Sequence, residues 1–134
     1  MVELEVSDMN MDTDMQKKMK HVVALLEQMD ECKTREAAEP IARQVFKAMD
    51  LDNDGVLQKK ELIEDFKRLE IYEKLNMKAI FNACSEEEKQ KKLHLYEAEI
   101  AAGVKWFMDH YDANHDATIS YDEFFAGVCK KNNI

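Results

Sequence analysis

Glycine and proline are scarce in this sequence, which holds three glycines and one proline among 134 residues. Strand-rich domains need many tight turns, and these two residue types supply much of the backbone geometry that such turns require. Their scarcity argues against a β-sandwich or a β-barrel. The sequence therefore predicts an all-α fold.

Long apolar runs are also absent, and no stretch of the chain is apolar enough to span a bilayer. The first residues, MVELEVSDMN, lack the basic start and the apolar stretch of a secretory signal. Val2 stands where myristoylation requires glycine. We therefore expect a cytoplasmic protein without a membrane span.

Motifs for disulfide, zinc and nucleophilic chemistry are missing. Cys32, Cys84 and Cys129 are odd in number and form no C-x-x-C pair, so we expect reduced thiols. The sequence has no G-x-S-x-G and no H-E-x-x-H, and its scattered glycines form no phosphate-binding loop. We expect that the protein is not an enzyme.

Positive charge is in deficit, with 19 Lys and Arg against 28 Asp and Glu and a net charge of −9. The basic residues are interleaved with acids and are not gathered into an arm that would bind phosphates. This distribution argues against a nucleic-acid partner. It favours cations and basic amphipathic helices.

Apolar residues with helical spacing begin after residue 12. Five of them recur at steps of three and four, and they are Met15, Met19, Val22, Leu26 and Met29. This stripe predicts an amphipathic helix near residues 13–30, behind a flexible leader over residues 1–12. We expect residues 13–134 to form a single domain. Pro40 is expected in the first turn of the next helix, where its missing N–H costs little.

The segment DLDNDGVLQKKE, residues 50–61, interrupts the helical pattern with closely spaced carboxylates. A hard cation that takes about six to eight oxygen ligands needs acids at alternating positions of a tight loop. Gly55 suits the sharp turn because it tolerates positive φ. The segment resembles the Ca²⁺ loop of the EF-hand superfamily, of the calmodulin-like and light-chain-like kind. The resemblance implies these ligands: Asp50, Asp52, Asp54, the Val56 carbonyl, Gln58 and Glu61.

A second segment, DANHDATISYDE at residues 112–123, follows the same template. The implied ligands are Asp112, Asn114, Asp116, the Thr118 carbonyl, Ser120 and Glu123. Ala117 stands where the EF-hand pattern has glycine, so a residue with a side chain must take a left-handed turn, at about 1 kcal/mol. We therefore expect a second site that is weaker than the first but still binds.

The resemblance implies two helix–loop–helix hands, one at about residues 38–70 and the other at about 97–131. Their loops would pair through a short antiparallel bridge, with Leu57 opposite Ile119, and an extra helix would precede them. The loops start 62 residues apart, which leaves an intervening segment, residues 71–96. Residues 85–99 are open to two interpretations, a helical linker or a degenerate hand. The intervening chain includes a helix start that Ser85 and Glu88 cap. A break near Gly103 in the helix that follows is left open.

The resemblance implies a protein that binds two Ca²⁺ ions, with Mg²⁺ as a competitor. We expect a Ca²⁺ sensor or adaptor that engages an amphipathic helix of a target protein. Two alternatives stay open at this point. One is an intracellular Ca²⁺ buffer, and the other is a light-chain-like structural subunit.

Overall fold

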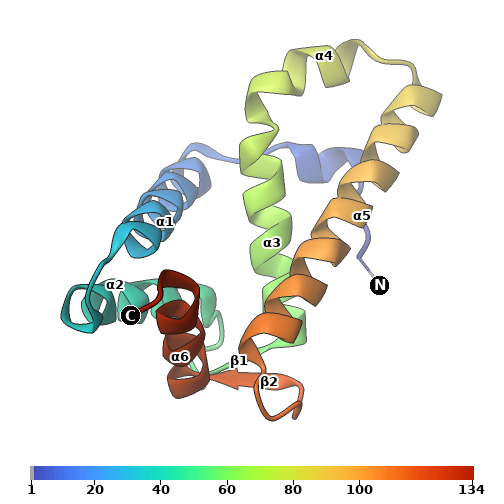
Figure 1. The fold of residues 1–134 in the computed structure, drawn as a ribbon. Helices are drawn as coiled ribbons and strands as arrows, with labels where there is room; N and C mark the ends of the chain where they lie inside the picture. Colours follow the sequence, from blue (N-terminus) through green and yellow to red (C-terminus); the bar gives the residue numbers. More distant parts are fainter. Residues whose placement is uncertain (1) are drawn as a thin grey trace.

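The computed structural model describes residues 2–134, and within this range the chain is mostly helical (Figure 1). Two three-residue strands accompany the helices. The elements in chain order are η1 (Val6–Met9), α1 (Thr13–Glu31), α2 (Arg35–Met49), β1 (Val56–Gln58), α3 (Lys59–Glu73), η2 (Leu75–Met77), α4 (Lys78–Ala83), α5 (Glu86–Tyr111), β2 (Thr118–Ser120) and α6 (Tyr121–Asn132). None of the helices in the described range has the length and apolar character that crossing a membrane requires.

Side-chain caps explain where the first two long helices begin. The Asp12 carboxylate accepts a hydrogen bond from the Met15 N–H at 2.7 Å and starts α1, which confirms the predicted helix. The Thr34 hydroxyl accepts from the Ala37 N–H at 3.1 Å and starts α2 at Arg35. Pro40 therefore lies beyond the first turn of α2, and the expected position was wrong. Because this cap starts the helix early, proline removes only one bond near its beginning.

Helix α5 is the longest element, with 26 residues from Glu86 to Tyr111. Ser85 and Glu88 form the predicted capping box at its start, where the Ser85 Oγ accepts from the Glu88 N–H at 3.2 Å. The helix continues through Gly103 without a break, and residues 86–99 all lie inside it. The chain from η2 to the start of α5 lies at the opposite end of the molecule from β1 and β2 (Figure 1).

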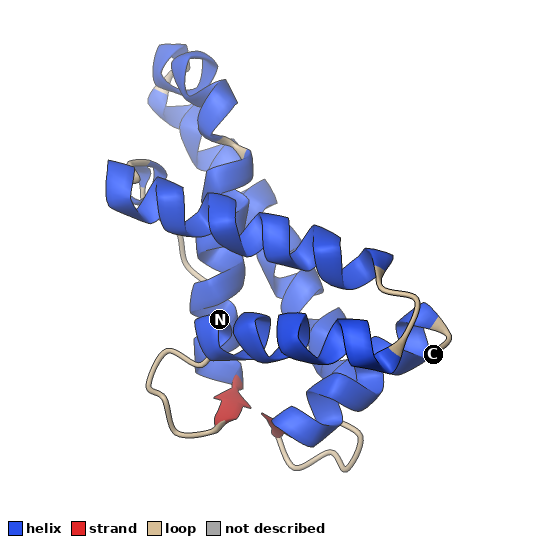
Figure 2. Cartoon of the chain, turned by 90° about the vertical axis from the view of Figure 1, so that its left-hand side faces the viewer, coloured by secondary structure: helices blue, strands red, loops and turns tan. Residues whose placement is uncertain are grey.

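The two helix pairs are arranged around a short antiparallel sheet. Helices α2 and α3 flank the first loop, α5 and α6 flank the second, and α3 packs on α5 while α2 packs on α6. Strands β1 and β2 pair with Leu57 opposite Ile119, and both side chains are fully buried. Figure 2 shows the two loops together at one end of the molecule, beside the strands. The predicted all-α class and antiparallel bridge are confirmed.

Aromatic side chains form the centre of the core near the strands. The ring centroids of Phe107 and Tyr111 are 4.4 Å apart, and those of Tyr111 and Phe124 are 5.2 Å apart. Helix α1 packs on α2, α3 and α6 and buries Met19, Met29 and neighbouring apolar residues of its stripe. It covers one side of the two helix pairs.

The segment before α1 lies against the helices in this structure. Leu4 and Met9 are 6% and 3% exposed, and the Leu4 N–H donates to Glu97 Oε2 at 2.7 Å. An ion pair joins Asp8 to Lys67 of α3 at 3.5 Å. The flexibility of residues 1–12 stays a prediction, and residue 1 lies outside the described range.

Candidate metal centres

The first loop turns sharply because two of its residues take left-handed backbone conformations. Helix α2 ends at Met49, and Asp50 follows as its C-cap with φ −81° and ψ 82°. Asn53 has φ 59° and Gly55 has φ 86°. Glycine and asparagine tolerate this region better than most other residues, so the sequence DLDNDG suits the turn.

Backbone N–H groups of the first loop hold its carboxylates in place. Asp50 Oδ2 accepts from the Gly55 N–H at 2.8 Å, and Asp54 Oδ1 accepts from the Val56 N–H at 3.1 Å. Glu61 closes the loop, since its Oε1 accepts from the Gln58 N–H at 3.0 Å and its Oε2 from the Asp52 N–H at 3.1 Å. The loop therefore orients four acids toward one region.

The first loop concentrates negative charge, and two of its acids are buried. Asp50 is 7% exposed and Glu61 is 4% exposed. Loss of hydration, together with hydrogen bonds to Asp54 and Asp50 and the charges of Asp54 and Glu61, raises the pKa of Asp52 to about 6. The hydrogen bond from the Val56 N–H lowers the pKa of Asp54. Mutual repulsion of this kind is relieved when a cation binds among the carboxylates.

The second loop repeats these hydrogen bonds 62 residues later. Asp112 Oδ2 accepts from the Ala117 N–H at 3.0 Å, as Asp50 does from Gly55. Glu123 closes this loop, since its Oε1 accepts from the Ser120 N–H at 3.1 Å and its Oε2 from the Asn114 N–H at 3.4 Å. The two loops share one internal framework.

Asp116 occupies the place in the second loop that Asp54 has in the first. Its Oδ1 accepts from the Thr118 N–H at 3.0 Å, which is the largest cause of its lowered pKa. His115 and Ala117 have φ 57° and 69°, so the left-handed turn predicted for Ala117 is confirmed. A residue with a side chain takes the conformation that glycine has in the first loop.

The structure brings the acidic members of both predicted sites together. One oxygen from each of four acids, Asp50, Asp52, Asp54 and Glu61, lies within 4.8 Å of the others. The acids of the second loop form a similar group, with Asp112, Asp116 and Glu123. Two oxygens on opposite sides of a Ca²⁺ ion lie about 5 Å apart, because Ca–O distances are about 2.3 to 2.6 Å. The spacing fits an ion of this size.

The remaining predicted ligands lie beside these clusters. Val56 and Thr118 begin the two strands. Gln58 and Ser120 are the N-caps of the helices that leave the loops, and Gln58 Nε2 donates to Asp54 Oδ2 at 2.9 Å. The Asn114 amide donates to Asp116 Oδ2 at 3.3 Å. All twelve predicted positions thus lie in or beside the two loops.

Sequence reasoning missed three features near the sites. Asn53 and His115 also take the left-handed conformation, two residues before Gly55 and Ala117, and their equal place in the two repeats was a usable signal. Asp65, one helical turn after Glu61, is buried at 7% exposure. Its place between Leu62 and Phe66 on the apolar stripe of α3 could have indicated this burial.

Comparisons of the chain with protein-family models, with curated proteins and with solved structures found no match.

Proposed function

We propose that this chain is a Ca²⁺-binding protein of the EF-hand type with two sites, acting as a sensor or adaptor and not as an enzyme. One observation carries the proposal. The two loops hold their acids by equivalent backbone hydrogen bonds, from the first acid, Asp50 or Asp112, to the closing glutamate, Glu61 or Glu123. A repeated set of converging carboxylates is the donor set that hard divalent cations prefer.

Each loop has the residues to hold a Ca²⁺ ion. The carboxylates of the first loop would supply most of the oxygens, with the Val56 carbonyl and Gln58 completing the shell. In the second loop Asn114 replaces one aspartate, so one negative charge fewer attracts the ion. Mg²⁺ would compete, although it is smaller and demands a tighter octahedral shell of oxygens.

The sensor role is supported by how the helices connect the two sites. Glu61 lies in the first turn of α3 and Glu123 in the first turn of α6, and these helices pack against α5 and α2. Binding of Ca²⁺ would draw both glutamates onto the ions. This movement would shift α3 and α6 against the helices on which they pack. Apolar surface exposed by that shift would receive an amphipathic helix of a target protein.

Calcium titration of the full chain by calorimetry and equilibrium dialysis tests the metal sites. Two ions should bind per chain, one should bind to Glu61→Gln or to Glu123→Gln, and the double variant should bind none. Glu64→Gln is the matched control, because Glu64 lies on α3 outside the loops. Its carboxylate forms an ion pair with Arg68 at 3.3 Å. Retention of both ions by the double variant would refute the assignment.

Trp106 offers an optical test of the second site. It lies on α5 six residues before Asp112 and is 52% exposed. Its emission should change as Ca²⁺ fills this site, and Glu123→Gln should abolish that change. An unaltered response in this variant would contradict the placement of the second ion.

A dye that binds exposed apolar surface distinguishes the sensor from the alternatives. Fluorescence of 8-anilinonaphthalene-1-sulfonate should rise on addition of Ca²⁺ if the helices open. An unchanged signal with two bound ions would favour a Ca²⁺ buffer. Crosslinking that finds the same partner with and without chelator would favour a light-chain-like structural subunit.

A further inference from the structure

A pocket of about 210 Å³ lies between α1 and the four helices that flank the loops. Its lining is mostly apolar and includes Met19, Met29, Asp65, Phe66, Trp106 and Phe124. No residue of the two loops, 50–61 and 112–123, lines it. The pocket is therefore a separate feature from the candidate metal sites.

One buried acid stands in the apolar wall without a partner. Asp65 is 7% exposed, and its Oδ2 atom is buried and accepts no hydrogen bond from the described residues. The other charged residues of the lining, Asp30 and Lys131, already pair with each other at 3.1 Å. A buried carboxylate oxygen without a donor is costly, so this wall suits a ligand that brings a donor or a positive charge.

The chemistry of the wall identifies the class of ligand. We propose that the pocket binds a small organic amine, whose apolar group lies among the methionine and aromatic side chains and whose ammonium N–H donates to Asp65 Oδ2. A cavity of about 150 Å³ can hold benzene. The larger pocket here suits a ring extended by a short aminoalkyl arm.

Aromatic rings and methionine make the rest of the pocket suitable for such a ligand. Phe66 and Phe124 supply flat apolar surface, and Met19 and Met29 supply flexible side chains that adapt to an irregular shape. Trp106 also lines the pocket and is half exposed, which places it at the boundary with solvent. Its ring is stacked on that of His110, with centroids 5.0 Å apart, and Lys131 Nζ lies 5.9 Å from its centroid.

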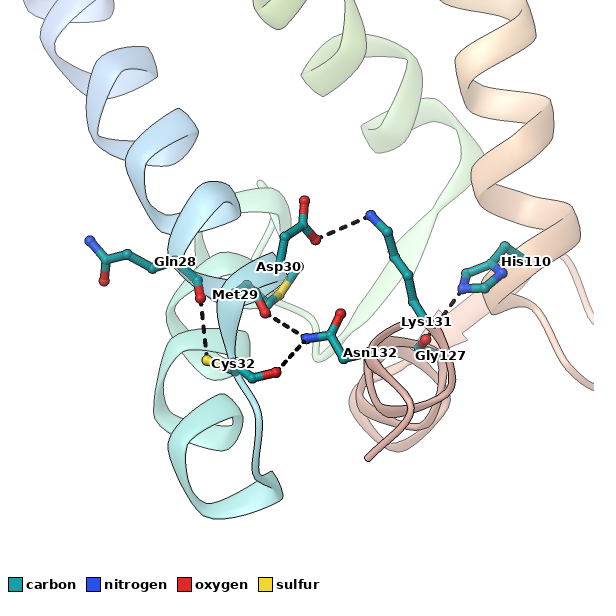
Figure 3. A network of polar contacts seen from close by, with 8 residues as sticks. All are labelled: Gln28, Met29, Asp30, Cys32, His110, Gly127, Lys131 and Asn132. Carbon is teal, nitrogen blue, oxygen red and sulfur yellow. Dashed lines mark hydrogen bonds and ion pairs between the residues drawn. The ribbon is translucent and has the colours of Figure 1, made fainter.

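The covering helix favours a small molecule over a partner helix. Helix α1 supplies Met19, Met29 and Asp30 to the lining, and it is fastened to α6 (Figure 3). Asp30 pairs with Lys131, and the Asn132 side-chain amide donates to the Met29 carbonyl at 2.7 Å. A second helix is about 10 Å wide and would have to displace α1. A small amine fits beneath it.

Titration of the full chain with 2-phenylethylamine tests this proposal, and chelator keeps the test independent of the calcium sites. Calorimetry and Trp106 emission should report saturable binding with one molecule per chain. Asp65→Asn keeps the size of the side chain and should weaken binding at least tenfold. Asp109→Asn, an exposed acid on α5 outside the lining, should leave binding unchanged.

Two further measurements guard against a fold defect and against unspecific apolar binding. Ala48→Leu places a larger side chain at the lining while it keeps Asp65, so it should abolish binding. The neutral 2-phenylethanol should bind the wild type and Asp65→Asn equally. The proposal is overturned if 2-phenylethylamine shows no saturable binding, or if Asp65→Asn or Ala48→Leu binds it as the wild type does.

Discussion

At the scale of single residues, Asp65 shows how a buried acid couples stability to pH. Burial is the main cause that raises its pKa from 3.8 to about 8, and the charges of Glu61 and Glu64 add to it. The attraction of Arg68 and Lys18 opposes the shift and does not cancel it. Without a bound amine, the folded chain therefore holds a proton on this side chain at a pH where the unfolded chain has lost it, and a bound ammonium group would take the place of that proton.

We predict that Asp65→Asn stabilises the fold in alkaline solution. Between about pH 4 and pH 8 the folded state binds more protons than the unfolded state, so stability falls as pH rises. Asparagine does not ionise, so the variant avoids the cost of a buried charge at high pH. Its free energy of unfolding should exceed that of the wild type by up to about 5 kcal/mol at pH 8.5, and by far less near pH 4.5.

Urea denaturation in chelator at both pH values measures the difference between the variant and the wild type. Asp109→Asn serves as the exposed control and should change little with pH, because Asp109 lies in solvent. Equal effects of Asp65→Asn at the two pH values would contradict the burial of the carboxylate.

Ala117 has a local cost that a single substitution can remove. With φ at 69°, its side chain occupies a region where L-residues are strained. Ala117→Gly should relieve about 1 kcal/mol, which tightens Ca²⁺ binding at the second site about fivefold.

Calorimetry in the Glu61→Gln background isolates the second site for this measurement. The reverse substitution, Gly55→Ala, should weaken the first site by a similar factor in the Glu123→Gln background. Gly55 has φ 86° and open space where a Cβ would stand, so only backbone strain would act there. Unchanged affinity in both variants would mean that the turn carries no penalty.

At the scale of elements, helices α5 and α6 approach closely at Gly127. A Cβ built on Gly127 would overlap the ring of Tyr111, which is 3% exposed and has little room to move. Gly127→Ala should therefore lower the free energy of unfolding by about 1 to 3 kcal/mol.

Gly103→Ala on α5 is the matched control for this contact. A Cβ there would lie 3.3 Å from Phe66 Cδ1, and alanine gains about 1 kcal/mol over glycine in helix propensity. These effects oppose each other, so its stability should stay within about 1 kcal/mol of the wild type. Thermal unfolding compares the variants, and equal stability of both would show that α6 can shift away from Tyr111.

At the scale of the whole molecule, the segment before α1 contacts two helices, α3 and α5. Leu4 is held by Glu97 of α5, and Asp8 by Lys67 of α3. We predict that the double substitution Leu4→Ala and Met9→Ala lowers the free energy of unfolding by at least about 2 kcal/mol, since both side chains are buried.

The exposed neighbour Glu3 provides the control, and Glu3→Ala should have almost no effect. Urea denaturation measures all three chains. If the double variant were as stable as the wild type, residues 1–12 would behave as the flexible leader that the sequence predicts.

Much of the fold follows from periodicity and spacing. The stripe from Met15 to Met29 predicts α1 within one residue of its observed bounds, because burial of one helix face requires that spacing. The register of Leu57 with Ile119 follows from the equal positions of these residues in two copies of one loop. These features depend on short-range sequence, which is why they can be predicted.

Other features were not predicted, one because two local signals compete and the others because they depend on contacts between distant segments. The start of α2 depends on the hydrogen bond of Thr34, which competes with a start nearer Pro40. The burial of Leu4 depends on Glu97, 93 residues later in the chain. The pocket around Asp65 depends on how α1 packs on other helices, which the stripe of α1 alone does not define.

The length of α5 has a mechanical consequence. With 26 residues it extends about 39 Å, from the tip of the molecule to Asp112 in the second loop. If the helix pivots rigidly by about 10° at that loop, its distant end travels about 7 Å, given its rise of about 1.5 Å per residue. A small rotation of α5 at the second loop would thus become a large movement of the outer surface around Ser85.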